Sequence, residues 1–231
     1  MALTVLQERL AALVTGLAES DGFVLAGGGG LAAHGLLERP TRDLDYFGPP
    51  DEPAGVHRLA DALERTCIAE GLEVRREREA DAFVRLTVQD AQDGCEVDIA
   101  IDYRALGPVA TRYGLALDLR ELGANKVLAV FDRAAPRDFL DLQELTKRFS
   151  LSELIALAAQ KDPGLDLDVL DHAMDQVRRI PPERLGLDDA AYRALRATVH
   201  RWQSTVRQLR DTDLAVGLER LDGPDSGIDM G

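Results

Sequence analysis

The sequence predicts an α+β fold in which a unit of strands and helices is followed by a helical unit. Apolar runs with the period of strands alternate with helical periodicities in the first half, whereas every apolar pattern after about residue 115 is helical. The 231 residues suffice for one large domain or two small ones. We therefore expect a core domain at 1–110, a helical domain at 111–221 and a disordered tail at 222–231.

The core domain is expected to contain three helices and five strands. Apolar residues at helical spacing predict helices over 3–18, 30–37 and 53–70. Short or alternating apolar runs predict strands over 23–27, 41–47, 72–77, 83–89 and 95–103. The segment DAQDG at 90–94 separates the last two strands and is typical of a hairpin turn. Alternation gives those two strands one apolar face, made of Val84, Leu86 and Val88 and of Cys95, Val97, Ile99 and Ile101.

The helical domain is expected to contain five helices. Their apolar periodicities cover 119–132, 137–148, 151–160, 166–179 and 188–210. Asp138 follows Pro136 in the first turn of the second of these helices, where a carboxylate favours the helix dipole. We therefore expect Asp138 to have a structural role.

Composition places the chain among ordinary globular proteins. It is 45% apolar and 29% charged, and no stretch approaches the roughly 18–20 apolar residues of a membrane span. The N-terminus lacks the pattern of a signal peptide, and Cys67 and Cys95 have no metal-binding spacing, so we expect buried thiols in a reducing cytoplasm. The net charge of −14 disfavours a nucleic-acid partner unless basic residues are segregated.

A glycine run and a pair of aspartates are the candidate phosphate-binding and metal-binding residues. Four glycines at 27–30 follow a short apolar strand, and the backbone N–H groups of such a turn can bind phosphate. Asp43 and Asp45 lie on one face of the next strand, where two like charges repel unless a cation lies between them. Asp98 is a candidate third carboxylate because its neighbours Val97 and Ile99 face the core. Each feature alone has a plain structural explanation, but their order indicates a metal-bound nucleoside triphosphate.

Two stretches, "GGGGLAAHGLLERPTRDLDYF" and "ELGANKVLAVFDRAAPRDFLDLQEL", resemble the motifs of a known enzyme family. The first is similar to the GG-x-A-L-A…R-x-T-x-DLD-x-F signature of AbiEii/AbiGii-type toxin nucleotidyltransferases, which include MenT-like proteins. The resemblance covers roughly residues 20–148. Family members commonly have Ser or Thr where this chain has Gly30. The second stretch matches the family's helical motif at Lys126, Arg133, Arg137, Asp138 and Asp141.

This resemblance implies a nucleotidyltransferase-fold mixed sheet with flanking helices, joined to a helical domain. It implies the toxin of a bacterial toxin–antitoxin pair, which transfers nucleotides, often pyrimidines, to the 3′ acceptor end of tRNA and so blocks aminoacylation. A cognate antitoxin is then expected, while the oligomeric state stays open. The implied metal is Mg²⁺ or Mn²⁺, held by Asp43, Asp45 and Asp98. The implied catalytic residues are Asp43, Asp45, Lys126 and Asp141, and the nucleotide-binding ones are Gly28, Gly29, Gly30, Arg39 and Lys126.

Two other functions fit the same residues. The first is a nucleotidyltransferase that modifies a small molecule, such as an antibiotic, or a protein. The second is a catalytically silent binding module that keeps only the fold. Intact Asp43 and Asp45 disfavour the silent module, because it has no reason to retain carboxylates that repel one another.

The helix expected at 188–210 carries a basic stripe. Residues 191–210 contain no acid, and Leu195, Val199, Trp202, Val206 and Leu209 form its apolar face. A second stripe, Arg193, Arg196, His200, Arg207 and Arg210, lies about 120° round the helix. The four arginines are candidate RNA contacts. The plainer interpretation is a solvated basic face that pairs with an acidic neighbouring helix.

Overall fold

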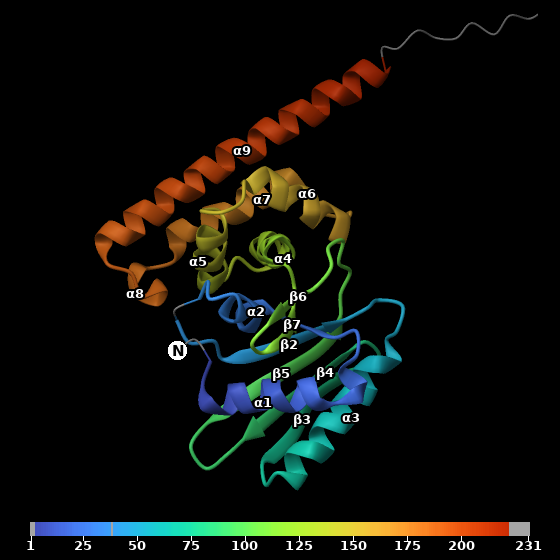
Figure 1. The fold of residues 1–231 in the computed structure, drawn as a ribbon. Coiled ribbons are helices and arrows are strands. Elements are labelled where there is room, and N and C mark those ends of the chain that lie inside the picture. Colours follow the sequence, from blue (N-terminus) through green and yellow to red (C-terminus); the bar gives the residue numbers. More distant parts are fainter. Residues whose placement is uncertain (1–2, 38, 222–231) are drawn as a thin grey trace, which may run out of the picture. The chain divides into compact units, whose positions relative to one another are not determined.

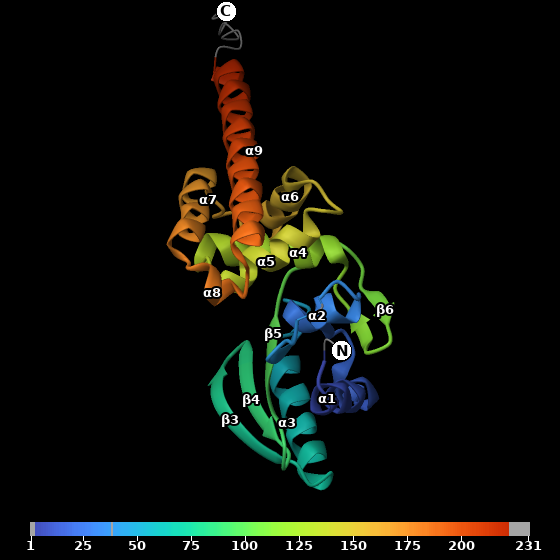
Figure 2. The same ribbon diagram turned by 90° about the vertical axis from the view of Figure 1, so that its left-hand side faces the viewer.

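The computed structural model describes residues 3–37 and 39–221 and confirms the α+β class. The chain divides into two compact units, the first formed by residues 1–126 and 157–163 and the second by 127–156 and 164–231. Figures 1 and 2 show strands in the first unit and helices alone in the second. This division differs from the boundary expected at residue 110. Two unpredicted strands, β6 and β7, add residues 109–116 to the sheet and so keep that segment in the first unit.

One mixed sheet of seven strands organises the first unit. In space the strands follow the order β3-β4-β5-β2-β1-β7-β6. The pairs β2–β5 and β1–β7 are parallel, and the other neighbours are antiparallel. The bounds are β1 Val24–Ala26, β2 Asp43–Gly48, β3 Glu73–Ala80, β4 Phe83–Gln89, β5 Gly94–Ile101, β6 Val109–Thr111 and β7 Gly114–Ala116.

The buried face of the sheet consists of apolar rows that cross its central strands. In one row Leu86 of β4 pairs with Val97 of β5, which pairs with Leu44 of β2. All three side chains are fully buried. The apolar face predicted for β4 and β5 is confirmed from Val84 to Val88 and from Cys95 to Ile99. Removing such side chains from water is the main stabilising contribution to this unit.

Two helices of the first unit pack on the sheet and on each other. They are α1, Val5–Gly16, and α3, Ala54–Ala69, which lie side by side in both views (Figures 1 and 2). A capping box begins α1, because the Thr4 hydroxyl accepts from the Gln7 amide while the Gln7 side chain accepts from the Thr4 amide. A short 3₁₀ turn, η1, covers Ala18–Ser20. The third helix, α2, is Gly27–Ala33.

The segment 157–163 belongs to the first unit because Lys161 is buried there. It is the last residue of α6, Leu151–Lys161, and its side chain is only 2% exposed. The Lys161 Nζ lies 2.8 Å from an Asp102 carboxylate oxygen and 3.1 Å from Glu121 Oε2. Glu121 lies in α4, Leu119–Asp132, is fully buried, and also accepts from the amides of Ala105 and Leu106. The ion pairs thus fasten the end of α6 to the first unit.

The second unit is helical, as expected, but two helices differ from prediction. The helix predicted over 166–179 is α7, Leu167–Met174, followed by the 3₁₀ helix η2, Asp175–Arg179. The last helix, α9, is Asp189–Leu221 and extends beyond the predicted residue 210. The unit also contains α5, Pro136–Leu145, the parts of α4 and α6 that fall within 127–156, and α8, Pro182–Leu185. The sequence did not indicate α8.

Two sequence predictions concern properties of the whole chain. Cys67 and Cys95 are free and buried, as expected, and burial raises their pKa values to about 11 and about 12. No helix in the described part of the chain has the length and apolarity of a membrane span. The tail predicted at 222–231 lies outside the described residues.

Candidate functional site

A row of charged side chains crosses the sheet on the face opposite the apolar rows. Asp45 of β2 pairs with Asp98 of β5, which pairs with Arg85 of β4. Two residues earlier on each of these strands, Asp43 of β2 pairs with Glu96 of β5. Side chains alternate between the two faces of a strand, so these five lie on one face. The structure therefore brings Asp43 and Asp45 beside Asp98, as the sequence predicts, and adds Glu96 and Arg85.

The glycine run meets the D-x-D strand directly. Gly27 follows Ala26, the partner of Asp45 across the β1–β2 pair, and has a φ of +54°. A Cβ added at Gly27 would overlap the Asp45 carboxylate, and one at Gly28 would overlap the Thr41 hydroxyl. A side chain at Gly27 would therefore collide with Asp45, and one at Gly28 would collide with Thr41.

Thr41 connects this contact to the other aspartate. Its side-chain hydroxyl donates to Asp43 Oδ1 over 3.1 Å, and Thr41 is buried. Its backbone oxygen accepts from the Gln7 side chain of α1 over 3.1 Å. Both aspartates of the D-x-D are thus adjacent to the glycine run, one directly and one through Thr41.

The glycines are helical, which differs from the expected turn followed by a helix at 30–37. Helix α2 begins at Gly27. Gly29 and Gly30 are buried, and a Cβ on them would press on Leu25 and Leu44 or on Leu122. Close packing alone therefore explains glycine at 29 and 30. Gly27 and Gly28 are the glycines that lie beside the aspartate strand.

Arg85 engages the third carboxylate with both ends of its guanidinium. Its Nε lies 2.7 Å from Asp98 Oδ1, and its Nη2 lies 2.6 Å from Asp98 Oδ2. Asp98 is 9% exposed, so this bidentate pair neutralises a nearly buried charge. Hydrogen bonding to Asp98 raises the pKa of Arg85, and the nearby Glu96 and Asp43 charges act in the same direction.

The remaining donor set suits a magnesium ion that is shared with a nucleotide. Among the described residues, no three His, Cys, Asp or Glu side chains form a metal-binding group. Mg²⁺ usually takes one or two carboxylates and completes its shell with water and substrate phosphates. Asp43 and Asp45 supply two such carboxylates, both partly exposed, on one strand face. These two carboxylates therefore fit such a metal without a third protein ligand.

Lys126 is a buried lysine of α4. It comes one helical turn after Leu122, whose methyl groups contact Gly30. Residues four apart share a helix face, so Lys126 lies on the same face of α4 as Leu122. Its side chain is 7% exposed. Burial at this position distinguishes Lys126 from a surface lysine.

The motif residues of the second unit divide into two kinds. Asp138 is fully buried and receives two hydrogen bonds from Arg133, at 2.9 and 3.0 Å. This pairing joins the end of α4 to α5 and agrees with the structural role expected for Asp138. Asp141 is one turn further on α5 and is 1% exposed. The arginines near the D-x-D differ in burial, since Arg39 is half-buried and Arg42 is exposed.

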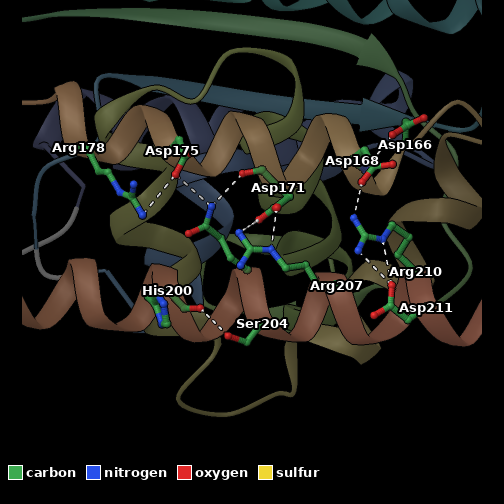
Figure 3. Close-up of polar contacts among 11 residues, drawn as sticks. Asp166, Asp168, Asp171, Asp175, Arg178, His200, Ser204, Arg207, Arg210 and Asp211 are labelled. Carbon is green, nitrogen blue, oxygen red and sulfur yellow. Dashed lines mark hydrogen bonds and ion pairs between the residues drawn. The ribbon is translucent and has the colours of Figure 1, made fainter.

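The basic stripe of α9 is half neutralised. Arg207 donates to Asp171 over 2.9 Å, and Arg210 lies 2.8 Å from Asp168, both acids being on α7 (Figure 3). These two arginines therefore pair with an acidic neighbouring helix, which was the plainer of the two interpretations of the stripe. Arg193 and Arg196 are exposed and form no ion pair within the described residues.

Sequence reasoning missed Gly27, Thr41, Arg85 and Glu96. A one-residue uncertainty in a run of four glycines hid the importance of Gly27. The alternation of β4 places Arg85 on its polar face, but only strand order reveals that this face lies beside Asp98. Glu96 shares a face with Asp98 in the sequence pattern, and its opposition to Asp43 depends on the β2–β5 register.

Comparison with known proteins assigns the family. A family model described as nucleotidyl transferase AbiEii toxin, of a type IV toxin–antitoxin system, matches residues 10–214. The chain belongs to this AbiEii family. It is therefore a nucleotidyltransferase of a toxin family, and the match extends well beyond residues 20–148, where the sequence motifs lie. A comparison with curated proteins finds no match.

Solved structures share the fold of this AbiEii protein. MenT4, a nucleotidyltransferase toxin from Mycobacterium tuberculosis, is 20% identical, with a TM-score of 0.55 over 92% of this chain and 91% of that chain. JHP933 from Helicobacter pylori is 19% identical, with a TM-score of 0.50 over 91% of this chain and 96% of that chain. At such identities the likeness concerns the fold, and it confirms the nucleotidyltransferase architecture.

Proposed function

We propose that this AbiEii protein transfers a nucleotide from a nucleoside triphosphate to the 3′ acceptor end of tRNA, and that this transfer blocks aminoacylation and translation. The observation that carries the proposal is the contact of Gly27 with Asp45, which joins a glycine run to a D-x-D on one side of a sheet. The family match supports transfer of a nucleotide by a toxin. The acceptor and a preference for pyrimidines follow the family resemblance.

In this proposal Asp43 and Asp45 hold Mg²⁺ or Mn²⁺, and Asp98 stays with Arg85 until a cation competes for it. When held by these carboxylates, the metal would supply positive charge next to the triphosphate. The backbone amides of Gly27 and Gly28, which adjoin the side chains of Asp45 and Thr41, are the proposed donors to phosphate oxygens. Gly29, Gly30 and Arg39 complete the nucleotide-binding segment implied by the resemblance.

The reaction forms a bond from the acceptor 3′ oxygen to the α-phosphorus and breaks the bond to the departing pyrophosphate. A carboxylate of the D-x-D beside that hydroxyl takes its proton. Lys126, a buried lysine of α4, provides an ammonium group for the triphosphate or the leaving pyrophosphate. The family motif adds Asp141 to the catalytic residues.

The family description also supports a partner and a compartment. A type IV toxin–antitoxin system includes an antitoxin, so we propose a cognate antitoxin that counteracts this protein. An acceptor such as tRNA places the reaction in the cytoplasm. The α9 arginines, first of all Arg193 and Arg196, are the proposed RNA contacts.

The decisive experiment incubates the protein with Mg²⁺, total tRNA and each labelled nucleoside triphosphate in turn. We expect label on RNA from the intact protein and a loss of at least about a hundredfold in Asp43→Ala, because the metal ligand is gone. Asp51→Ala removes an exposed aspartate outside the sheet and is the matched control.

Two results would contradict the proposal. If the Asp43→Ala protein is well folded and active, the assignment of the D-x-D as the metal site is wrong. Absence of label on RNA with all four nucleotides would direct the search to a small-molecule or protein acceptor, for which the half-neutralised stripe leaves room.

A further inference from the structure

A pocket of about 300 Å³ lies between η2 and α9 in the second unit. We refer to it as the η2–α9 pocket. It is outside the sheet that carries the D-x-D, and its lining includes Arg193 and Arg196, the two α9 arginines first among the proposed RNA contacts. Its lining residues are Val177, Arg178, Arg193, Arg196, Ala197, Val199, His200 and Gln203.

The lining residues divide by burial into an inner wall and a rim. Val177, Val199 and Gln203 are each 2% exposed and form the inner wall. Arg178, Arg193, Arg196 and His200 are exposed and form the rim. Among the described residues, the rim contains three permanent positive charges, and no lining residue is acidic.

The charge of the rim stands out because neighbouring arginines on α9 are neutralised. Figure 3 shows Arg207 and Arg210 directed at the acids of α7, while Arg178 and His200 lie toward the other end of the helix pair. The Arg178 Nη2 atom lies 3.6 Å from Asp175 Oδ1. Within the described residues Arg193 and Arg196 have no ion pair. The pocket therefore retains net positive charge in a protein whose formal charge is −14.

Hydrogen bonds hold the two sides of the pocket in place. The Tyr192 hydroxyl of α9 donates to the Val177 oxygen of η2 over 3.1 Å. The Gln203 side-chain amide donates to the Asp171 backbone oxygen and to Asp175 Oδ1, both over 3.1 Å. The Arg196 guanidinium lies 5.9 Å from the centre of the Tyr192 ring. A ligand would thus meet a largely preformed site.

This chemistry selects an anion with several acceptor oxygens. Arginine guanidinium groups bind phosphate oxygens in a bidentate manner, and three arginines line the rim. Cationic ligands would be repelled, and a purely apolar ligand would leave the rim charges unsatisfied. The volume admits a phosphate with part of its attached sugar.

We infer that the η2–α9 pocket binds a backbone phosphate of the acceptor RNA strand, which rests on the proposed function. An RNA strand presents phosphates at regular spacing, so one can enter the pocket while its neighbours meet exposed arginines. The site would thereby add affinity for RNA without reading its sequence.

The test measures binding of fluorescently labelled tRNA by anisotropy, without nucleotide, so that binding is separated from transfer. We expect Arg193→Gln/Arg196→Gln to weaken binding about tenfold and to reduce the salt dependence of binding. The control Arg179→Gln/Arg201→Gln removes the same charge from η2 and α9 at exposed positions outside the pocket, and we expect it to retain affinity.

Three results would overturn the inference. They are unchanged affinity in the pocket variant, an equal loss in the control variant, and displacement of tRNA by inorganic phosphate or free nucleotide at concentrations comparable to that of the RNA. The transfer assay distinguishes this failure from failure of the proposed function. If the protein transfers nucleotide to RNA but the pocket variant binds tRNA normally, the proposed function holds and the pocket inference is wrong. If the pocket variant binds tRNA weakly but the intact protein transfers no nucleotide to it, the pocket inference holds and tRNA is not the acceptor.

Discussion

Gly27 is the residue at which the glycine run touches the D-x-D. Its φ of +54° already disfavours a side chain, and a Cβ there would overlap the Asp45 carboxylate. Gly35 has a φ of +68°, but a Cβ added there would meet nothing within 4 Å, so a side chain at Gly35 experiences the backbone effect alone. Substitution of Gly35 therefore measures backbone strain alone, whereas substitution of Gly27 measures backbone strain together with steric overlap.

We predict that Gly27→Ala destabilises the protein by about 2–4 kcal/mol and displaces Asp45, whereas Gly35→Ala costs about 1–2 kcal/mol. Denaturant unfolding measures both changes, and Mg²⁺ titration calorimetry reports the displacement. Equal destabilisation by the two substitutions would contradict the close approach at Gly27.

Arg85 stabilises Asp98 through an ion pair and also places a positive charge beside the proposed metal ligands. Its substitution tests both effects. Removing its guanidinium leaves Asp98 nearly buried without its bidentate partner. We predict that Arg85→Gln lowers stability by about 1–2 kcal/mol, less than for a fully buried pair because the Arg85 side chain is 38% exposed.

The same variant is expected to bind Mg²⁺ more tightly, because one positive charge beside Asp43 and Asp45 is lost. Calorimetric titration of the metal without nucleotide provides the measurement. Arg75→Gln is the control, since Arg75 is 72% exposed and, among the residues that the structure describes, forms an ion pair with Glu77 alone. If both variants have wild-type metal affinity, Arg85 does not compete with a cation for this site.

At the scale of elements, the end of α6 depends on a buried ion pair. Lys161 neutralises the fully buried Glu121 and the partly exposed Asp102. We predict that Lys161→Met costs about 3–5 kcal/mol, because it leaves buried carboxylates without a counterion.

The exposed pair Lys147–Glu144 is the matched control for this substitution. Lys147→Met should cost less than about 1 kcal/mol. Urea unfolding of the two variants decides the question, and similar midpoints would mean that Glu121 is satisfied by the Ala105 and Leu106 amides alone.

Most elements were predictable because their periodicity is local. The apolar alternation of β4 and β5 and the range 119–132 of α4 agree with the structure. β6 and β7 have three residues each, too few for a period to be seen. The end of α7 at Met174 is a change of helix type within one apolar pattern, which periodicity does not detect.

At the scale of the whole molecule, charge governs any encounter with RNA. The formal charge is −14, and the stripe arginines Arg207 and Arg210 are paired with acids. We predict a shallow salt dependence of tRNA affinity, with a logarithmic slope of about −2, as expected for roughly three phosphate contacts.

Binding isotherms over a series of potassium chloride concentrations give this slope. A slope steeper than about −6 would require many more cationic contacts than the exposed rim arginines provide. The measurement is independent of transfer, so it applies whichever nucleotide the enzyme uses.

The sequence by itself determined the α+β class, the family resemblance and the residue types of the candidate site, because these depend on local periodicity and on short motifs. Only the tertiary structure decided which charges meet. Strand order places Arg85 on Asp98, the path of α2 places Gly27 on Asp45, and helix packing neutralises Arg207 while Arg193 remains exposed. These pairings join residues distant in the chain, and their electrostatic energy depends on separation in space and on burial, which a linear pattern does not contain.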